Sequence, residues 1–190
     1  MVESGEAELL LESDEDLSPL DVSPDGRALA FRQSQDIYLL SLQDQSVSPL
    51  VATDASEVFA KFSPDGRFLA YVSDETGQRE MYVQPYPPTG GKWQVSRGGA
   101  NDAVWAADGN ELYYLRGTTM VAVRVQLSPG FEVLGERELF EAPPTNTGRS
   151  FDVHPSSGRF LFIDKTIESP PQHVNVVTNF FDLLTPGEGQ

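Results

Sequence analysis

The sequence predicts an all-β fold, namely a β-propeller of about four four-stranded antiparallel blades. One observation is an internal repeat, because the Ser-Pro-Asp-Gly of Ser23–Gly26 returns at Ser63–Gly66 within two closely matching segments. A second is the composition, since 14 Pro and 16 Gly would break the helices of a helical array but suit a chain that turns often between short strands. Repeat periods of about 40 to 50 residues are typical of stacked units such as four-stranded propeller blades.

Two weaker copies extend the repeat toward the end of the chain. Asp108 and Gly109 keep the turn, and an apolar run over 112–115 follows them. Pro155–Gly158 keeps the Pro and the Gly of the turn, with one more residue between the flanking runs. The same structural unit is therefore predicted about four times.

The residues of the repeated turn are predicted to be structural. Pro presets φ for a turn, Asp can accept hydrogen bonds from its own backbone, and Gly accepts a positive φ. The predicted turn residues are Asp25, Gly26, Asp65, Gly66, Asp108, Gly109 and Gly158. A catalytic role for these aspartates is the alternative, but one active site would not need three equivalent copies, so we predict no catalytic residue.

Each turn is followed by an apolar run that forms a hairpin with the strand before it. The runs lie at 28–31, 68–72, 112–115 and 160–163. Third strands are expected at 36–42, 80–85, 119–125 and 172–179, and more exposed fourth strands at 48–52, 92–96 and 138–141. Pro49 suits an edge strand because it removes one donor from the ladder. The predicted blades are approximately 18–52, 57–96, 101–141 and 149–179.

The two ends of the chain are expected to differ from the repeats. Within the N-terminal segment 1–17, residues 8–12 are a candidate strand that would close the last blade by pairing with it. Residues 180–184 are a candidate for a short amphipathic helical turn, and 185–190 are expected to form a flexible tail.

The charge and the missing cysteines exclude several classes of function. The net charge is −16, so nucleic acid and anionic membrane surfaces are disfavoured as partners. The chain has no Cys, which excludes disulfides, thiolate nucleophiles and Cys-bound metals but leaves the compartment open. No apolar run is long enough to span a bilayer, and the acidic start is unlike a signal peptide. We predict no membrane insertion by this segment.

The remaining candidates for chemistry are few. His154 and His173 lack the local spacing of a zinc site, although Asp152 shares a strand face with His154. The acidic cluster Ser13–Asp16 lacks the pattern of a calcium loop and is better interpreted as a solvated turn. No Gly-x-Ser-x-Gly motif of a serine hydrolase occurs. We therefore predict no metal and no cofactor.

Aromatic residues and loops are the candidates for binding. Trp93 and Trp105 are expected in core or inter-blade packing, and Tyr86–Pro88 form a loop that either contacts a partner or is simply rigid. Ligands usually dock at one rim of a propeller. The rim loops here are expected at 14–18, 53–57, 97–101 and 143–149.

Several of these segments resemble a known family. Phe62–Asp74 followed by Glu80–Val83 resembles the WD40-like (PD40) repeat of TolB-type β-propellers. Tyr82–Pro87, Gly90–Ser96 and the Val104-Trp105 pair resemble the TolB-like propeller at the C-terminal end of many bacterial transmembrane serine/threonine kinases. The end of the chain at 174–184 resembles the end of those kinases as well, so the resemblance covers about residues 18–184.

The resemblance implies a function only in outline. TolB-like propellers usually have six or more blades, so this chain is either part of a longer propeller, a ring closed by four blades, or one of several copies that complete a larger ring as a homo-oligomer. No kinase motif is present. The expected function is a non-catalytic module for binding or sensing a protein or small-molecule ligand, within the C-terminal part of a larger signalling protein. The alternatives are an accessory propeller of a peptidase or other hydrolase, and a self-assembling fragment. A bacterial, extracytoplasmic or periplasmic location follows if the parent is a membrane kinase, and a cytoplasmic one otherwise.

Overall fold

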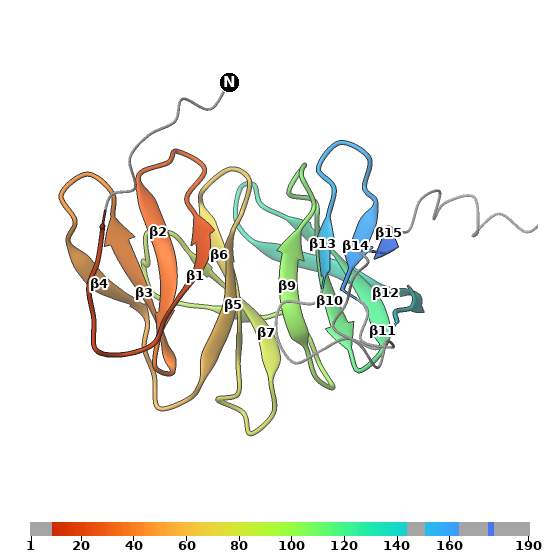
Figure 1. The fold of residues 1–190 in the computed structure, drawn as a ribbon. Helices are drawn as coiled ribbons and strands as arrows, with labels where there is room; N and C mark the ends of the chain where they lie inside the picture. Colours follow the sequence, from red (N-terminus) through yellow and green to blue (C-terminus); the bar gives the residue numbers. More distant parts are fainter. Residues whose placement is uncertain (1–8, 144–150, 164–174, 177–190) are drawn as a thin grey trace, which may run out of the picture.

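The structure, a computed structural model, describes residues 9–143, 151–163 and 175–176, and every regular element in these ranges is a β-strand (Figure 1). The strands form four antiparallel sheets, and within each sheet they lie side by side in chain order. The described ranges hold no helix of the length and apolar character that a bilayer crossing requires.

The sheets follow the repeat along the chain. The first contains β1 (Leu17–Val22), β2 (Ala28–Gln33), β3 (Asp36–Ser41) and β4 (Val47–Val51). The second contains β5 (Glu57–Phe62), β6 (Phe68–Ser73), β7 (Glu80–Pro85) and β8 (Trp93–Gln94). The third contains β9 (Asn101–Trp105), β10 (Glu111–Arg116), β11 (Thr119–Gln126) and β12 (Glu132–Glu141). The fourth contains β13 (Phe151–Val153), β14 (Phe160–Phe162) and β15 (Asn175–Val176).

Most strands differ from their predicted bounds by one or two residues, as β4 and β8 do, and two predictions differ more clearly. β12 begins at Glu132, well before the predicted strand at 138–141, because the long strand β11 pairs with it down to the Gln126–Glu132 pair. Residues 9–12, part of the predicted strand at 8–12, form no strand, and Leu9 is 73% exposed rather than packed on a sheet. Residue 8, the helical turn at 180–184 and the tail at 185–190 lie outside the described residues.

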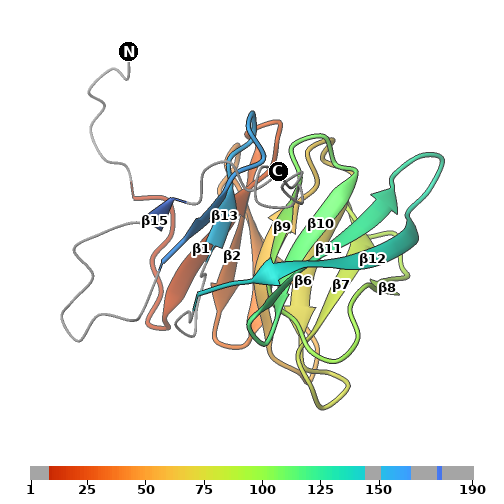
Figure 2. The same ribbon diagram turned by 90° about the vertical axis from the view of Figure 1, so that its right-hand side faces the viewer.

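The first strands of successive sheets are neighbours. β1 contacts β5, β5 contacts β9, and β9 contacts β13, so these strands line one side of the molecule. In each four-stranded sheet the fourth strand forms the edge opposite the first strand, and β8 is seen at the right of Figure 2. Sheets whose first strands lie next to one another in this way are arranged like propeller blades around a common axis.

Apolar side chains fill the space between each pair of sheets. Ile37 of the first sheet and Tyr71 of the second belong to one buried cluster. Met81 and Leu112 belong to a second cluster between the second and third sheets, and Phe162 belongs to a third between the last two. Burial of each such side chain stabilises the fold by about 1.5–3 kcal/mol, so the packing of neighbouring sheets is the main support of the structure.

Candidate functional site

The repeated turn is held by hydrogen bonds within itself. In the second copy, the Ser63 hydroxyl donates to Asp65 Oδ1 at 2.6 Å and accepts from the Phe68 amide at 3.0 Å. The Arg67 amide also donates to Asp65 Oδ1, at 3.1 Å. The first copy has the same bonds around Asp25. These carboxylates are engaged by their own turns, and the hydrogen bonds from Ser23 and the Arg27 amide keep the pKa of Asp25 below its ordinary value.

The turns of neighbouring sheets also touch one another. Gly66 has a φ of +70°, and a Cβ built on it would lie 3.7 Å from Pro24 Cδ of the preceding turn. Gly109 has a φ of +73°, and its Cβ would lie 3.7 Å from Pro64 Cδ in the same way. Asp108 accepts two hydrogen bonds from Asn110, both at 3.0 Å. The Pro and Gly of the repeat therefore pack sheet against sheet.

The fourth turn uses a histidine in place of the serine. His154 Nδ1 accepts from the Ser156 and Ser157 amides, each at 3.3 Å. Gly158 closes this turn with a φ of +64°. Asp152 Oδ1 accepts from the amide of Val153 at 2.9 Å. His173 lies outside the described residues, and no group of three or more possible metal ligands occurs among the described ones.

The acidic cluster near the start of the chain bonds to protein donors. The Glu15 amide donates to the Ser13 hydroxyl at 3.0 Å, and the Ser34 hydroxyl donates to Glu15 Oε2 at 2.5 Å. That second bond lowers the pKa of Glu15. The cluster therefore forms a turn whose polar groups are hydrogen-bonded to the protein itself.

The two tryptophans have different environments. Trp105 is buried, and its Nε1 donates to the Lys61 carbonyl at 3.1 Å, which ties β9 to β5. Trp93 is 38% exposed at the edge strand β8, with its ring 5.1 Å from that of Phe131. Tyr86 packs edge-to-face on Phe62 at 4.8 Å.

A groove lies on the side of the molecule where the first strands meet. Its volume is about 380 Å³, within the range of small-ligand sites. The lining, called the inner groove below, comprises Ser18, Pro19, Leu20, Arg32, Val58, Phe59, Ala60, Lys61, Arg79 and Asp102. A larger hollow of about 690 Å³ lies beside the hairpin turns, but its aspartates Asp65 and Asp108 are engaged in those turns. The inner groove is therefore the better candidate site.

Irregular backbone shapes the inner groove. Phe59 has a φ of 58° and Asp102 a φ of 66°, a left-handed conformation that is costly for residues with a side chain. The two residues occupy equivalent positions of successive repeats, and the β5–β6 pairing shifts its register between Val58 and Lys61. Such bulges bend a strand and redirect its side chains, and they are frequent next to functional sites.

Three cations converge on the groove from separate elements. Lys61 of β5 is fixed, because its Nζ donates to Asp21 Oδ1 at 2.8 Å while Asp21 Oδ2 accepts from the Phe62 amide at 2.9 Å. Arg32 of β2 has a buried Nε with no hydrogen-bond partner in the described part of the chain. Arg79, which precedes β7, is exposed. The groove is thus a locally basic site in a chain of net charge −16.

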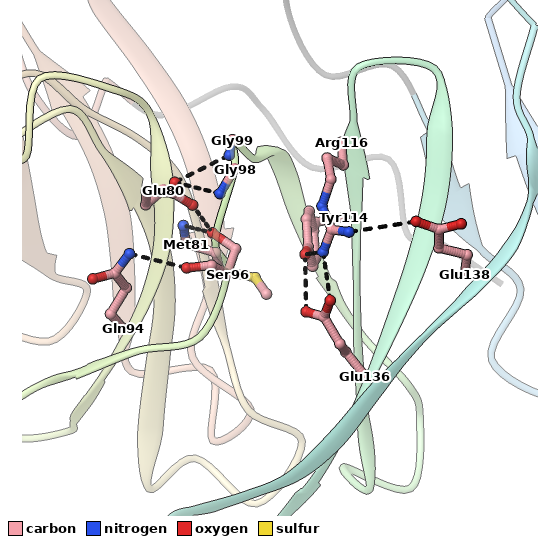
Figure 3. A network of polar contacts seen from close by, with 10 residues as sticks. All are labelled: Glu80, Met81, Gln94, Ser96, Gly98, Gly99, Tyr114, Arg116, Glu136 and Glu138. Atoms are coloured by element: carbon pink, nitrogen blue, oxygen red, sulfur yellow. Dashed lines mark hydrogen bonds and ion pairs between the residues drawn. The ribbon is translucent and has the colours of Figure 1, made fainter.

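A buried carboxylate holds the loop that leads to Asp102. Glu80 Oε1 accepts from the Gly98 amide at 2.9 Å and from the Gly99 amide at 3.0 Å (Figure 3). The Ser96 hydroxyl donates to its other oxygen. The Glu80 side chain therefore fixes the loop at 97–100, which leads into β9. Asp102 of β9 is buried, and its Oδ1 accepts from the Ala103 amide at 3.1 Å.

A second part of the network in Figure 3 fixes β10 against β12. Arg116 Nη2 donates to Glu136 at 2.7 Å and to the Tyr114 hydroxyl at 2.6 Å. Burial raises the pKa of Tyr114. This cluster lies outside the groove lining and stabilises the third sheet.

Another buried acid borders the groove lining at the start of β5. The Glu57 side chain is fully buried, and its Oε1 accepts from the Thr53 hydroxyl at 2.5 Å and the Ser73 hydroxyl at 3.3 Å. Its Oε2 has no partner in the described part of the chain. Burial raises the pKa of Glu57.

The structure shares its fold with solved propellers. No protein-family model matches the chain. It is similar to TolB from Acinetobacter baumannii, with a TM-score of 0.60 and 18% identity over 88% of this chain and 41% of that one. It is also similar to an oligogalacturonate lyase in complex with manganese (TM-score 0.63, 16% identity, 86% and 49% of the two chains). A third neighbour comes from a nidogen/laminin complex (TM-score 0.63, 11% identity, 85% and 61%).

These likenesses define the architecture. The chain spans between 41% and 61% of the length of the three neighbours. The neighbours include an enzyme as well as TolB, so they carry the fold and not one activity. The predicted fold class is confirmed: the chain is an all-β partial propeller that resembles TolB.

Proposed function

We propose that the chain is a non-catalytic propeller module that binds a ligand or a protein partner in the inner groove. The observation that carries this proposal is the meeting of strained backbone at Phe59 and Asp102 with the cations Arg32 and Arg79 around one cavity. Residues held in unfavourable conformations cluster at binding sites, because the surrounding structure keeps them ready for the ligand.

The groups in the groove suit binding better than turnover. Lys61 is held by Asp21, and Asp102 accepts a backbone hydrogen bond, so neither is arranged as a nucleophile with an adjacent base. Arginine side chains stay protonated and serve recognition and positioning. The accessory propeller of a peptidase or other hydrolase would use the same groove as an entry path for its substrate.

The wider context of the module rests on the sequence resemblance. The segments 62–96 and 174–184 resemble the propeller of bacterial membrane kinases, which supports a sensor within the C-terminal part of a larger signalling protein. An extracytoplasmic or periplasmic location belongs to that proposal. A parent gene with an upstream kinase domain and a membrane span supports it, and a downstream hydrolase domain would contradict it.

Self-assembly is a second candidate, favoured by one observation. Leu161 of β14 and Ile163, which follows β14, are 37% and 49% exposed, whereas Phe160 and Phe162 of the same strand are buried against the third sheet. A homo-oligomer that completes a propeller ring would cover them. Sedimentation equilibrium decides this point, since a strict monomer at all concentrations rules out the ring of copies.

The binding proposal can be tested with a fragment screen followed by NMR. The probes are small polar molecules, neutral and charged, and the readout is the set of amide signals that shift. We expect shifts at Leu20, Phe59 and Lys61. These shifts should be lost in Ser18→Trp, which places a large side chain at an exposed position of the groove lining. The matched control is Ser48→Trp on the edge strand β4, which should bind as the parent does. Shifts confined to the hollow beside the hairpin turns would overturn the proposal.

A further inference from the structure

We infer that the inner groove selects a carboxylate-bearing ligand, which the guanidinium groups of Arg32 and Arg79 hold. This inference rests on the proposed function, because it assigns a ligand class to the same groove. The argument has three steps, which concern local charge, unused hydrogen-bond donors, and the walls of the groove.

The groove concentrates positive charge in an acidic protein. Its lining contains three cations, Arg32, Lys61 and Arg79, of which Lys61 is paired with Asp21, and one carboxylate, that of Asp102. The whole chain has 29 acidic side chains and 13 basic ones, so this lining reverses the general balance. A positively charged cleft on a negatively charged protein attracts anionic ligands to that one place.

The two arginines have hydrogen-bonding capacity that the protein leaves unused. Arg32 Nε is shielded from solvent and has no partner among the described residues. The Arg79 carbonyl accepts from the Ala100 amide at 2.8 Å, which holds its backbone, while its side chain is exposed at the groove. A buried donor without a partner is unfavourable, so an acceptor that reaches it gains more than an acceptor at the surface. The planar guanidinium fork matches the two oxygens of a carboxylate.

The walls of the groove suit an organic carboxylate better than inorganic phosphate. Leu20, Val58 and Phe59 give part of the lining an apolar character that fits the hydrocarbon stem of an organic acid. A volume of about 380 Å³ admits one short acid or one acidic side chain.

Two sources would present this chemistry, namely a free dicarboxylic acid and an acidic side chain or C-terminus of a partner protein. The probes are glutarate, a blocked Gly-Glu-Gly-Glu-Gly peptide, and inorganic phosphate. Binding is measured by calorimetry near neutral pH at about 0.15 M salt, where screening limits long-range repulsion to about 8 Å. Preference for glutarate identifies a metabolite-like ligand, and preference for the peptide identifies a protein partner.

The variants separate the site from general electrostatics. We expect Arg32→Gln and Arg79→Gln each to lower the affinity for the tighter-binding carboxylate probe by about tenfold, because each removes a charge-assisted hydrogen bond. Arg27→Gln is the matched control, since Arg27 is an exposed arginine beside Asp25 and outside the groove. It should change binding by less than about twofold. Arg79 is exposed, so its variant should fold normally even if the Arg32 variant does not.

Each outcome has a definite meaning. Equal losses in Arg27→Gln and Arg79→Gln would overturn the inference, as would phosphate binding as tight as carboxylate binding. If neutral fragments bind the groove but neither carboxylate probe does, the ligand class is wrong and the proposed binding function stands. If no probe of any kind binds the groove, both fail.

Discussion

Replacing Gly66 with alanine isolates the backbone requirement of the repeated turn. Gly66 has a φ of +70°, and the added Cβ would meet only Pro24, at 3.7 and 3.8 Å, which are ordinary contacts. The left-handed conformation alone should therefore lower the free energy of unfolding, by about 1–2 kcal/mol. Valine should cost more at this position because its branched Cβ is especially unfavourable at positive φ.

The equivalent change at Gly109 adds a packing cost. Its φ is similar, at +73°, but the Cβ would lie 3.1 Å from Leu127 Cδ1. Leu127 is half-buried and can shift only in part, so we expect Gly109→Ala to lower the free energy of unfolding by about 2–3 kcal/mol in total. Gly26, with a φ of +70° and nothing within 4 Å of its Cβ position, gives the baseline. Shortening Leu127 to alanine in the Gly109 variant should remove the excess.

Urea unfolding followed by tryptophan fluorescence, with far-UV circular dichroism as a second probe, measures these differences. The reasoning predicts equal losses for Gly26→Ala and Gly66→Ala and a larger one for Gly109→Ala. Unchanged stability in the Gly66 variant would refute the turn assignment. Equal losses at Gly66 and Gly109 would show that the contact with Leu127 carries no cost.

Three further changes test the buried polar contacts. Glu57→Gln should raise the free energy of unfolding at neutral pH, because burial raises the pKa of Glu57 and its ionised form costs stability above that pKa. The difference from the parent should shrink as the pH falls toward 4.5, the ordinary value, and a pH-independent difference would contradict this reasoning. Trp105→Phe should cost about 1–3 kcal/mol in thermal unfolding, since it removes the 3.1 Å bond to the Lys61 carbonyl and part of a buried ring. Asp21→Ala should cost about 2 kcal/mol in urea, because the Phe62 amide and Lys61 lose a shared carboxylate; a loss below about 0.5 kcal/mol would show that this link is unimportant in solution.

The sequence is sufficient for the parts of the fold that local chemistry determines. The Ser-Pro-Asp-Gly turn encodes its own hydrogen bonds, and the apolar run after it places β2, β6 and β10. β12 is harder to predict because its first half is exposed and contains Gly135 and two glutamates, and only pairing with β11 makes it a strand. The strand predicted at 8–12 fails over 9–12 because an apolar run such as Leu9–Leu11 also needs a sheet edge to pair with.

The inner groove could not be predicted from the sequence. Arg32, Lys61 and Arg79 come from three elements, and nothing in their spacing indicates that they line one cavity. The left-handed backbone conformation of Phe59 and Asp102 could not be predicted from the sequence pattern either, since neither residue type requires that conformation. The available signal is their equivalent place in the repeat, which marks a position but not its geometry. Among the residues that the structure describes, the predicted rim loops contribute only Ser18 to the groove lining.

The most direct test of the account is a crystal structure of the chain grown with glutarate. The account predicts electron density for the acid in the inner groove, with its oxygens within hydrogen-bond distance of the Arg32 and Arg79 guanidinium groups. Glutarate bound only elsewhere, or a groove filled by the chain's own side chains, would contradict the claim that this groove holds a carboxylate.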